Sequence, residues 1–199
     1  MLICELSRMD PFSSDTAFDA LYPAHISQLA SRHWTPLSVA KEAATFLAVG
    51  DSPRILDIGS GVGKFCLVGA HFFPSAFFAG VEHRGSLHAI ATKLSIKLGL
   101  SNTAFFEGDF SNIDFSAYQH FYFYNSFYEH LELSDLIDDS VPISNELFHA
   151  YNRNLYKALK KMPSGTRIAT FHSTENEMPT SYEVVGIGSN EDLKFWIKL

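Results

Sequence analysis

The sequence predicts an α/β protein with a doubly wound, mostly parallel sheet of seven strands, a C-terminal antiparallel hairpin and helices on both faces of the sheet. Three observations support this fold class. Short apolar runs alternate with helix-periodic segments from residue 54 to residue 171. A glycine-rich turn joins the first of these runs to the helix that follows it. Two final strand-like runs flank a short polar turn near the C-terminus.

The predicted strands are short and apolar, as expected for strands that are buried on both faces of a sheet. The five parallel strands are expected at residues 54–58, 77–82, 103–107, 121–125 and 166–171. The terminal hairpin is expected at residues 182–187 and 193–199, where it would add one antiparallel strand at the edge of the sheet.

The predicted helices carry apolar residues at helical spacing. They are expected at residues 16–30, 35–47, 64–73, 86–98 and 144–161, the first of them with only a weak pattern. Thr35 is expected to cap the second helix, with Pro36 at its first helical position. We expect one domain over residues 1–199, with residues 1–50 as an N-terminal helical cap.

Composition excludes several classes of function. The chain has 199 residues and a formal net charge of −7, which argues against binding to nucleic acid or to anionic membranes through the whole surface. Its two cysteines, Cys4 and Cys66, form no disulfide or zinc pattern, so no metal is expected. The N-terminus lacks the pattern of a signal peptide, and no apolar run is long enough to span a bilayer. These features favour a cytoplasmic protein.

The glycine-rich segment from residue 55 to residue 65 places Gly59, Gly61 and Gly63 between a strand and a helix. Glycines at such a turn let a ligand approach the backbone closely. A phosphate-binding P-loop does not fit, because isoleucine stands where its first glycine belongs and phenylalanine replaces its hydroxyl residue. A dinucleotide fingerprint fits poorly, because Lys64 occupies the position of its last glycine.

This segment resembles motif I of the class I, Rossmann-like methyltransferases that use S-adenosylmethionine, with Asp57 just before the glycines. It is more loosely similar to the non-SET histone lysine methyltransferases. The resemblance implies that the loop lies against the methionine and ribose parts of the cofactor. The residues implied are Asp57, Gly59, Ser60, Gly61 and Gly63. In this superfamily the segment before the first strand often closes over the cofactor, which implies a contact from Thr35.

Acidic residues lie at the end of the second predicted strand and just after the third. Glu82 lies about 20 residues past the glycines, where a carboxylate can accept hydrogen bonds from both ribose hydroxyls. His83 comes next in the chain and is assigned to the same site. By resemblance, Asp109 is expected to bind the adenine amino group, with Phe110 as its hydrophobic neighbour.

The fourth predicted strand ends in Asn125, followed by Tyr128 three residues later. This segment resembles a variant of the Asn-Pro-Pro-Tyr/Phe motif of amino-group methyltransferases, with Ser126 and Phe127 in place of the two prolines. An amide oxygen can accept a hydrogen bond from an attacking amine, and an aromatic face can enclose the cation that forms. Asn125, which is also expected to contact the cofactor, and Tyr128 are therefore the candidate catalytic residues.

These observations together predict transfer of a methyl group from S-adenosylmethionine to an amino group, on a protein side chain or a small molecule. Three alternatives stay open: O-methylation of a small molecule, a nicotinamide-dependent oxidoreductase, and a silent cofactor-binding module. The methyl acceptor, the oligomeric state and any contact of Tyr22 or Trp34 with the substrate are not determined by the sequence.

Overall fold

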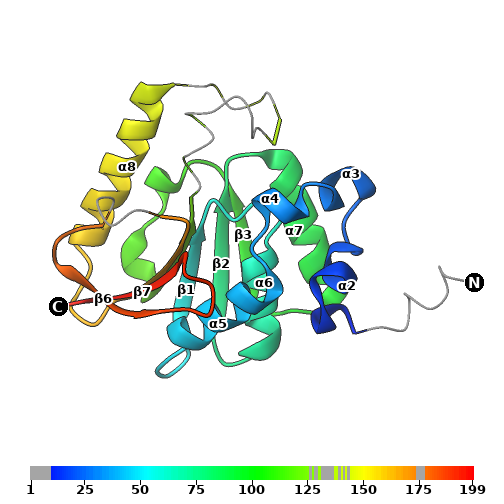
Figure 1. Cartoon of the computed structure of the whole chain (residues 1–199), viewed down its shortest axis with the longest axis horizontal. Coiled ribbons are helices and arrows are strands. Elements are labelled where there is room, and N and C mark those ends of the chain that lie inside the picture. Colours follow the sequence, from blue (N-terminus) through cyan, green and yellow to red (C-terminus); the bar gives the residue numbers. More distant parts are fainter. Residues whose placement is uncertain are drawn as a thin grey trace, which may run out of the picture.

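The computed structural model describes residues 10–125, 127, 130, 137, 138, 140, 142, 144–173 and 178–199. Its centre is a seven-stranded sheet with the order β3-β2-β1-β4-β5-β7-β6 (Figure 1). The strands are β1 (Arg54–Ile58), β2 (Phe77–Glu82), β3 (Thr103–Glu107), β4 (His120–Tyr124), β5 (Arg167–Phe171), β6 (Tyr182–Ile187) and β7 (Leu193–Lys198). The predicted fold class is confirmed, including the C-terminal hairpin.

The direction of the last two strands differs in one detail from the expectation. Strands β1 to β5 pair in parallel, and β7 pairs antiparallel with both β5 and β6. The antiparallel hairpin is as predicted, but the chain crosses to the edge as β6 before it returns as β7, so that β7 is the antiparallel neighbour of β5. Strand β6 forms the edge and runs parallel to β5.

Helices cover both faces of the sheet. Helices α5 (Leu37–Leu47), α6 (Lys64–Phe72) and α7 (Gly85–Leu98) pack on one face, and α8 (Asn145–Lys160) packs on the other with the short 3-10 segments η2 (Phe110–Asn112) and η3 (Phe115–Ala117) (Figure 1). Successive strand residues point to opposite faces, so Ile55 joins the first core and Leu56 the second. In the part of the chain that the structure describes, every helix is too short or too polar to cross a bilayer.

Local chemistry sets several helix ends. Gly63, with a φ of 78°, precedes α6, and Gly99, with a φ of 68°, ends α7, so both adopt the left-handed conformation that favours glycine. The Ser144 side chain accepts a hydrogen bond from the Leu147 amide at 3.2 Å and caps α8. These caps fix where each helix begins relative to the sheet edge.

The N-terminal segment contains short helices in place of the single helix predicted for residues 16–30. They are η1 (Pro11–Ser13), α2 (Asp15–Asp19), α3 (Ala24–Ser27) and α4 (Ala30–His33). Pro23 takes an extended ψ of 147° at the start of α3, which ends any continuous helix there. The weak apolar pattern was compatible with helical turns, and the proline separated them.

The start of α5 also differs from the prediction. Pro36 stands at the cap position, the helix begins at Leu37, and no side chain of the preceding residue caps it. The Thr35 hydroxyl instead pairs with the Tyr122 hydroxyl at 3.0 Å. The Leu37 amide donates to Asp15 Oδ1 at 2.8 Å, so a residue of α2 supplies the cap.

Candidate functional site

A cavity of about 810 Å³ opens at the carboxyl ends of β1, β2 and β4. This is the edge of an open α/β sheet where ligands bind, at the point where the strand order reverses. Most of the predicted site residues line this single cavity: Thr35, Asp57, Gly59, Ser60, Gly61, Glu82, His83, Asp109, Phe110 and Asn125. The size is within the usual range for a site that holds a small-molecule cofactor.

Two predicted site residues stand apart from this group. Gly63 is not part of the cavity lining. A Cβ atom there would come within 2.7 Å of the Phe105 ring and 2.8 Å of Ala91, so glycine allows α6 to start against β3 and α7. Tyr128 lies outside the residues that the structure describes, and so does Ser126.

Hydrogen bonds within the protein hold the glycine-rich loop. The amides of Gly59 and Ser60 donate to the Val81 carbonyl at 2.9 and 3.0 Å, and the Gly63 amide donates to the Ser60 carbonyl at 2.8 Å. The Ser60 hydroxyl lies over Gly80, where a Cβ atom would be only 2.5 Å from it. The loop is therefore fixed by the end of β2 before any ligand binds.

The Glu82 carboxylate joins the loop to the strand end. Its Oε2 accepts from the Gly61 amide at 2.9 Å, and its Oε1 accepts from the Arg84 amide at 2.8 Å. The side chain is buried, and the two amide donors orient its carboxylate. Because each carboxylate oxygen can accept more than one hydrogen bond, this arrangement is compatible with further donors from a ligand.

Asp57 is a buried carboxyl group at the floor of the cavity. Its pKa is raised to about 8, chiefly by burial and also by the nearby Glu82 charge, while a hydrogen bond from Cys66 lowers it. The Cys66 Sγ lies 3.6 Å from Asp57 Oδ2, and Cys66 is buried. A carboxyl group with such a pKa responds to a cation placed beside it, because the cation favours its ionised form.

The far end of the cavity is formed by the turn after β3. Asp109 accepts a hydrogen bond from the Ser111 amide at 2.8 Å, which orients its carboxylate. Phe110 is buried and stacks on Phe127 with ring centroids 5.1 Å apart. The turn therefore presents a polar group beside an apolar aromatic wall, as a purine ring requires.

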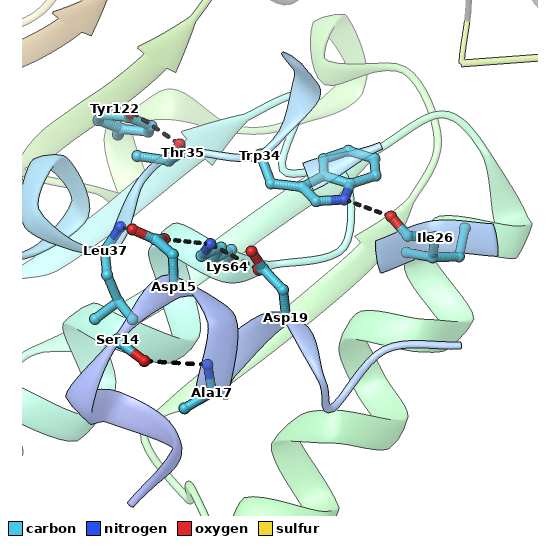
Figure 2. A network of polar contacts seen from close by, with 10 residues as sticks. All are labelled: Ser14, Asp15, Ala17, Asp19, Ile26, Trp34, Thr35, Leu37, Lys64 and Tyr122. Atoms are coloured by element: carbon cyan, nitrogen blue, oxygen red, sulfur yellow. Dashed lines mark hydrogen bonds and ion pairs between the residues drawn. The ribbon is translucent and has the colours of Figure 1, made fainter. Parts of the chain in front are cut away.

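Trp34 covers the glycine-rich loop from the N-terminal segment. Its Nε1 donates to the Ile26 carbonyl at 3.1 Å (Figure 2). A Cβ atom on Gly61 would lie 2.8 Å from its ring. Trp34 is buried and lines the cavity. Tyr22 is also buried, but it is not part of the lining.

Lys64 connects α6 to the N-terminal segment. Its Nζ lies 2.6 Å from Asp15 Oδ1 and 2.7 Å from Asp19 Oδ1, and its side chain is only 3% exposed (Figure 2). The sequence predicted no such role for Lys64. The only signal was a lysine directly after the last glycine of the loop, and both of its partners lie more than 40 residues away.

His172 was not predicted as a site residue either. It follows β5 and lines the same cavity as Asn125, which follows β4. The available signal was its position directly after an apolar strand, at the edge where parallel strands end. Asn125 and His172 both have positive φ angles, 39° and 55°.

No family model and no curated protein matches this sequence. Solved structures share its fold. An RNA methyltransferase from Salinibacter ruber, in complex with S-adenosyl-L-homocysteine, has a TM-score of 0.58 and 18% identity over 82% of this chain and 91% of that chain. TrmN from Thermus thermophilus has a TM-score of 0.59 and 14% identity over 86% of this chain and 52% of its own. A SAM-dependent methyltransferase from Aquifex aeolicus has a TM-score of 0.53 and 12% identity over 86% of this chain and 95% of that chain.

These similarities show that the chain has the Rossmann-like fold of class I methyltransferases. It spans nearly all of the Salinibacter and Aquifex chains and about half of TrmN. Because one fold carries many activities, the function has to be argued from the cavity.

Proposed function

We propose that this chain is a methyltransferase that uses S-adenosylmethionine to methylate an amino group. The observation that carries this proposal is the position of Glu82. Its carboxylate accepts a hydrogen bond from the Gly61 amide and so links the end of β2 to the glycine-rich loop. It also lines the same cavity as Asp57 and Asp109. A buried, oriented carboxylate at this place is suited to accept hydrogen bonds from the two ribose hydroxyls of the cofactor.

The cavity suits the other parts of the cofactor as well. The Asp57 carboxyl group is placed to interact with a cationic ammonium group, and the Asp109 turn with its Phe110 wall suits an adenine ring. When bound, S-adenosylmethionine supplies an electrophilic methyl group on a positively charged sulfur. The protein then has to align the acceptor with that methyl group, since methyl transfer is an in-line displacement.

The hydrogen bonds of the loop favour this cofactor over a nicotinamide dinucleotide. A pyrophosphate is bound by amide groups at the turn that precedes the helix. Here the amides of Gly59, Ser60, Gly61 and Gly63 already donate to oxygen atoms of the protein. The methionine and ribose parts of S-adenosylmethionine do not require those donors.

Methylation of nitrogen is supported by Asn125. It follows β4, which lies beside β1 at the reversal of strand order, and it lines the cavity. Its amide oxygen can accept a hydrogen bond from an amine and stabilise the positive charge that develops on the nitrogen during transfer. A protein side chain and a small amine both remain as acceptors in this proposal.

The test is calorimetric titration with S-adenosylhomocysteine of the wild-type protein, Glu82→Gln and Glu107→Gln. Glu107 is the matched control, because it pairs with Glu82 in the β2–β3 register but is exposed and lies outside the cavity lining. We expect micromolar binding by the wild type, weakened about tenfold or more by Glu82→Gln, which corresponds to about 1.4 kcal/mol or above. Glu107→Gln is expected to bind as the wild type does.

Two results would contradict the proposal. Failure of the wild type to bind S-adenosylhomocysteine would remove the cofactor from the site. Equal weakening by both glutamine variants would show that Glu82 acts through the charge of the sheet edge and not through contact with the ribose.

A further inference from the structure

We propose that His172, held by Asp192, is the group that removes a proton from the methyl acceptor beside Asn125. This inference deepens the proposed function and rests on it. It adds a base to the site, and it specifies that the methyl acceptor binds as an ammonium ion. The argument comes from the register of three neighbouring strands, from backbone strain and from the contacts of the His172 ring.

The three residues lie in register at one edge of the sheet. Asn125 and His172 each follow the last residue of their strand, and these two last residues are paired in the β4–β5 register. Asp192 precedes the first residue of β7, which is paired with the last residue of β5. Asn125, His172 and Asp192 therefore lie next to one another, each at the end of one of three adjacent strands.

Backbone strain marks two of these positions. Among the residues that the structure describes, only Ser52, Asn125 and His172 have a positive φ without being glycine. Ser52 lies in the turn before β1, whereas Asn125 and His172 both line the cavity. Asparagine and histidine adopt this conformation more readily than most other residues, and non-glycine positions of this kind cluster at functional sites.

Asp192 holds His172 through two contacts. The His172 amide donates to the Asp192 carbonyl at 3.1 Å, and the ring Nδ1 lies 3.2 Å from Asp192 Oδ2. The first contact fixes the backbone and the second fixes the ring. Both side chains are exposed, and the carboxylate beside Nδ1 orients the ring so that Nε2 is the nitrogen left to accept a proton.

The proton and electron balance of the step is complete with these groups. An ammonium acceptor gives a proton to His172 Nε2 and becomes a neutral amine with a lone pair. That lone pair forms a bond to the methyl carbon, the carbon–sulfur bond breaks, and its electron pair returns to sulfur to give S-adenosylhomocysteine. The positive charge moves to the methylated nitrogen, where Asn125 accepts a hydrogen bond, and the imidazolium releases its proton to water.

The test uses sinefungin, an analogue in which a carbon bearing an amino group replaces the methylsulfonium, so that an ammonium lies where the transferred methyl group would be. Calorimetry compares its affinity with that of S-adenosylhomocysteine. We expect the wild type to prefer sinefungin by about tenfold, because His172 and Asn125 accept hydrogen bonds from the ammonium. His172→Ala is expected to lose most of this preference while it keeps its affinity for S-adenosylhomocysteine.

Asp192→Asn tests the positioning role. It keeps the carbonyl that holds the backbone but weakens the hold on the ring, so we expect an intermediate loss of the sinefungin preference. His149→Ala is the control, because His149 is exposed on α8 and lies outside the cavity lining.

The outcomes separate this inference from the proposed function. An unchanged sinefungin preference in His172→Ala, or no preference in the wild type, would overturn the role of His172 and leave the cofactor in place. Binding of neither compound to the wild type would overturn both proposals. Loss of S-adenosylhomocysteine affinity in His172→Ala would show that the residue supports the cofactor site, which would also overturn the inference.

Discussion

Replacing Asp57 with asparagine is expected to change how the stability of the ligand-free protein depends on pH. The pKa of Asp57 is about 8 in the folded protein, chiefly because the group is buried, compared with about 3.9 in an unfolded chain. Between these values the folded protein binds a proton that the unfolded chain does not. The free energy of unfolding therefore falls by about 1.4 kcal/mol for each unit of rising pH.

His120 opposes this slope over part of the range. Burial first, and then the Arg167 charge, lower its pKa to about 4, so below about pH 6.5 the unfolded chain binds a proton that the folded protein does not. The two contributions offset each other from about pH 4 to about pH 6.5. Between pH 6.5 and 8 the slope from Asp57 remains, and it amounts to about 2 kcal/mol over this window.

The assay is urea denaturation, followed by circular dichroism, at several pH values between 6.5 and 8. We expect the wild type to lose about 2 kcal/mol across this range and Asp57→Asn to stay level, because asparagine carries no titrating proton. Asp51→Asn is the control, since Asp51 is exposed in the turn before β1 and should leave the wild-type slope unchanged. A slope in Asp57→Asn equal to that of the wild type would refute the assignment of a protonated Asp57.

Two further predictions concern the residues around the cavity. Lys64→Met is expected to lower the free energy of unfolding by about 3 kcal/mol in urea denaturation, because Asp19 loses its buried cationic partner and Asp15 loses a partner as well. A loss below about 1 kcal/mol would mean that these ion pairs contribute little to stability. Asn125→Ala is expected to keep its affinity for S-adenosylhomocysteine within about threefold while it stops transfer of labelled methyl groups to amines. Full transfer by this variant would exclude the proposed hydrogen bond.

The sheet was predictable from sequence because its strands are continuous apolar runs between strong turn residues. Strands β1 and β2 are buried on both faces and match their predicted bounds, and the edge strand β3 matches too although it is partly exposed. The start of α5 was wrong because the Thr35 hydroxyl pairs with Tyr122 and Asp15 caps the helix from 22 residues away. A local pattern of cap residues carries no information about such distant partners.

The candidate site was predictable where it depends on the order of motifs along the chain. Parallel strands bring their carboxyl ends to one edge, so residues at or just after the ends of different strands, such as Glu82 and Asp109, were expected to meet. Lys64 and His172 were not predicted, because their partners Asp19 and Asp192 come from other elements and leave no local spacing. Contacts of this kind between distant elements are visible only once the chain is folded.

The contact between Trp34 and Gly61 has a consequence for how this protein can change by mutation. A side chain at position 61 would meet the Trp34 ring at 2.8 Å, and the φ of 53° there disfavours residues other than glycine and asparagine. A smaller residue at position 34 would remove only the first obstacle and would open the cavity wall. Glycine is therefore expected to stay at position 61 even in a relative that has a smaller residue at position 34, whereas a tryptophan at position 34 requires glycine at position 61.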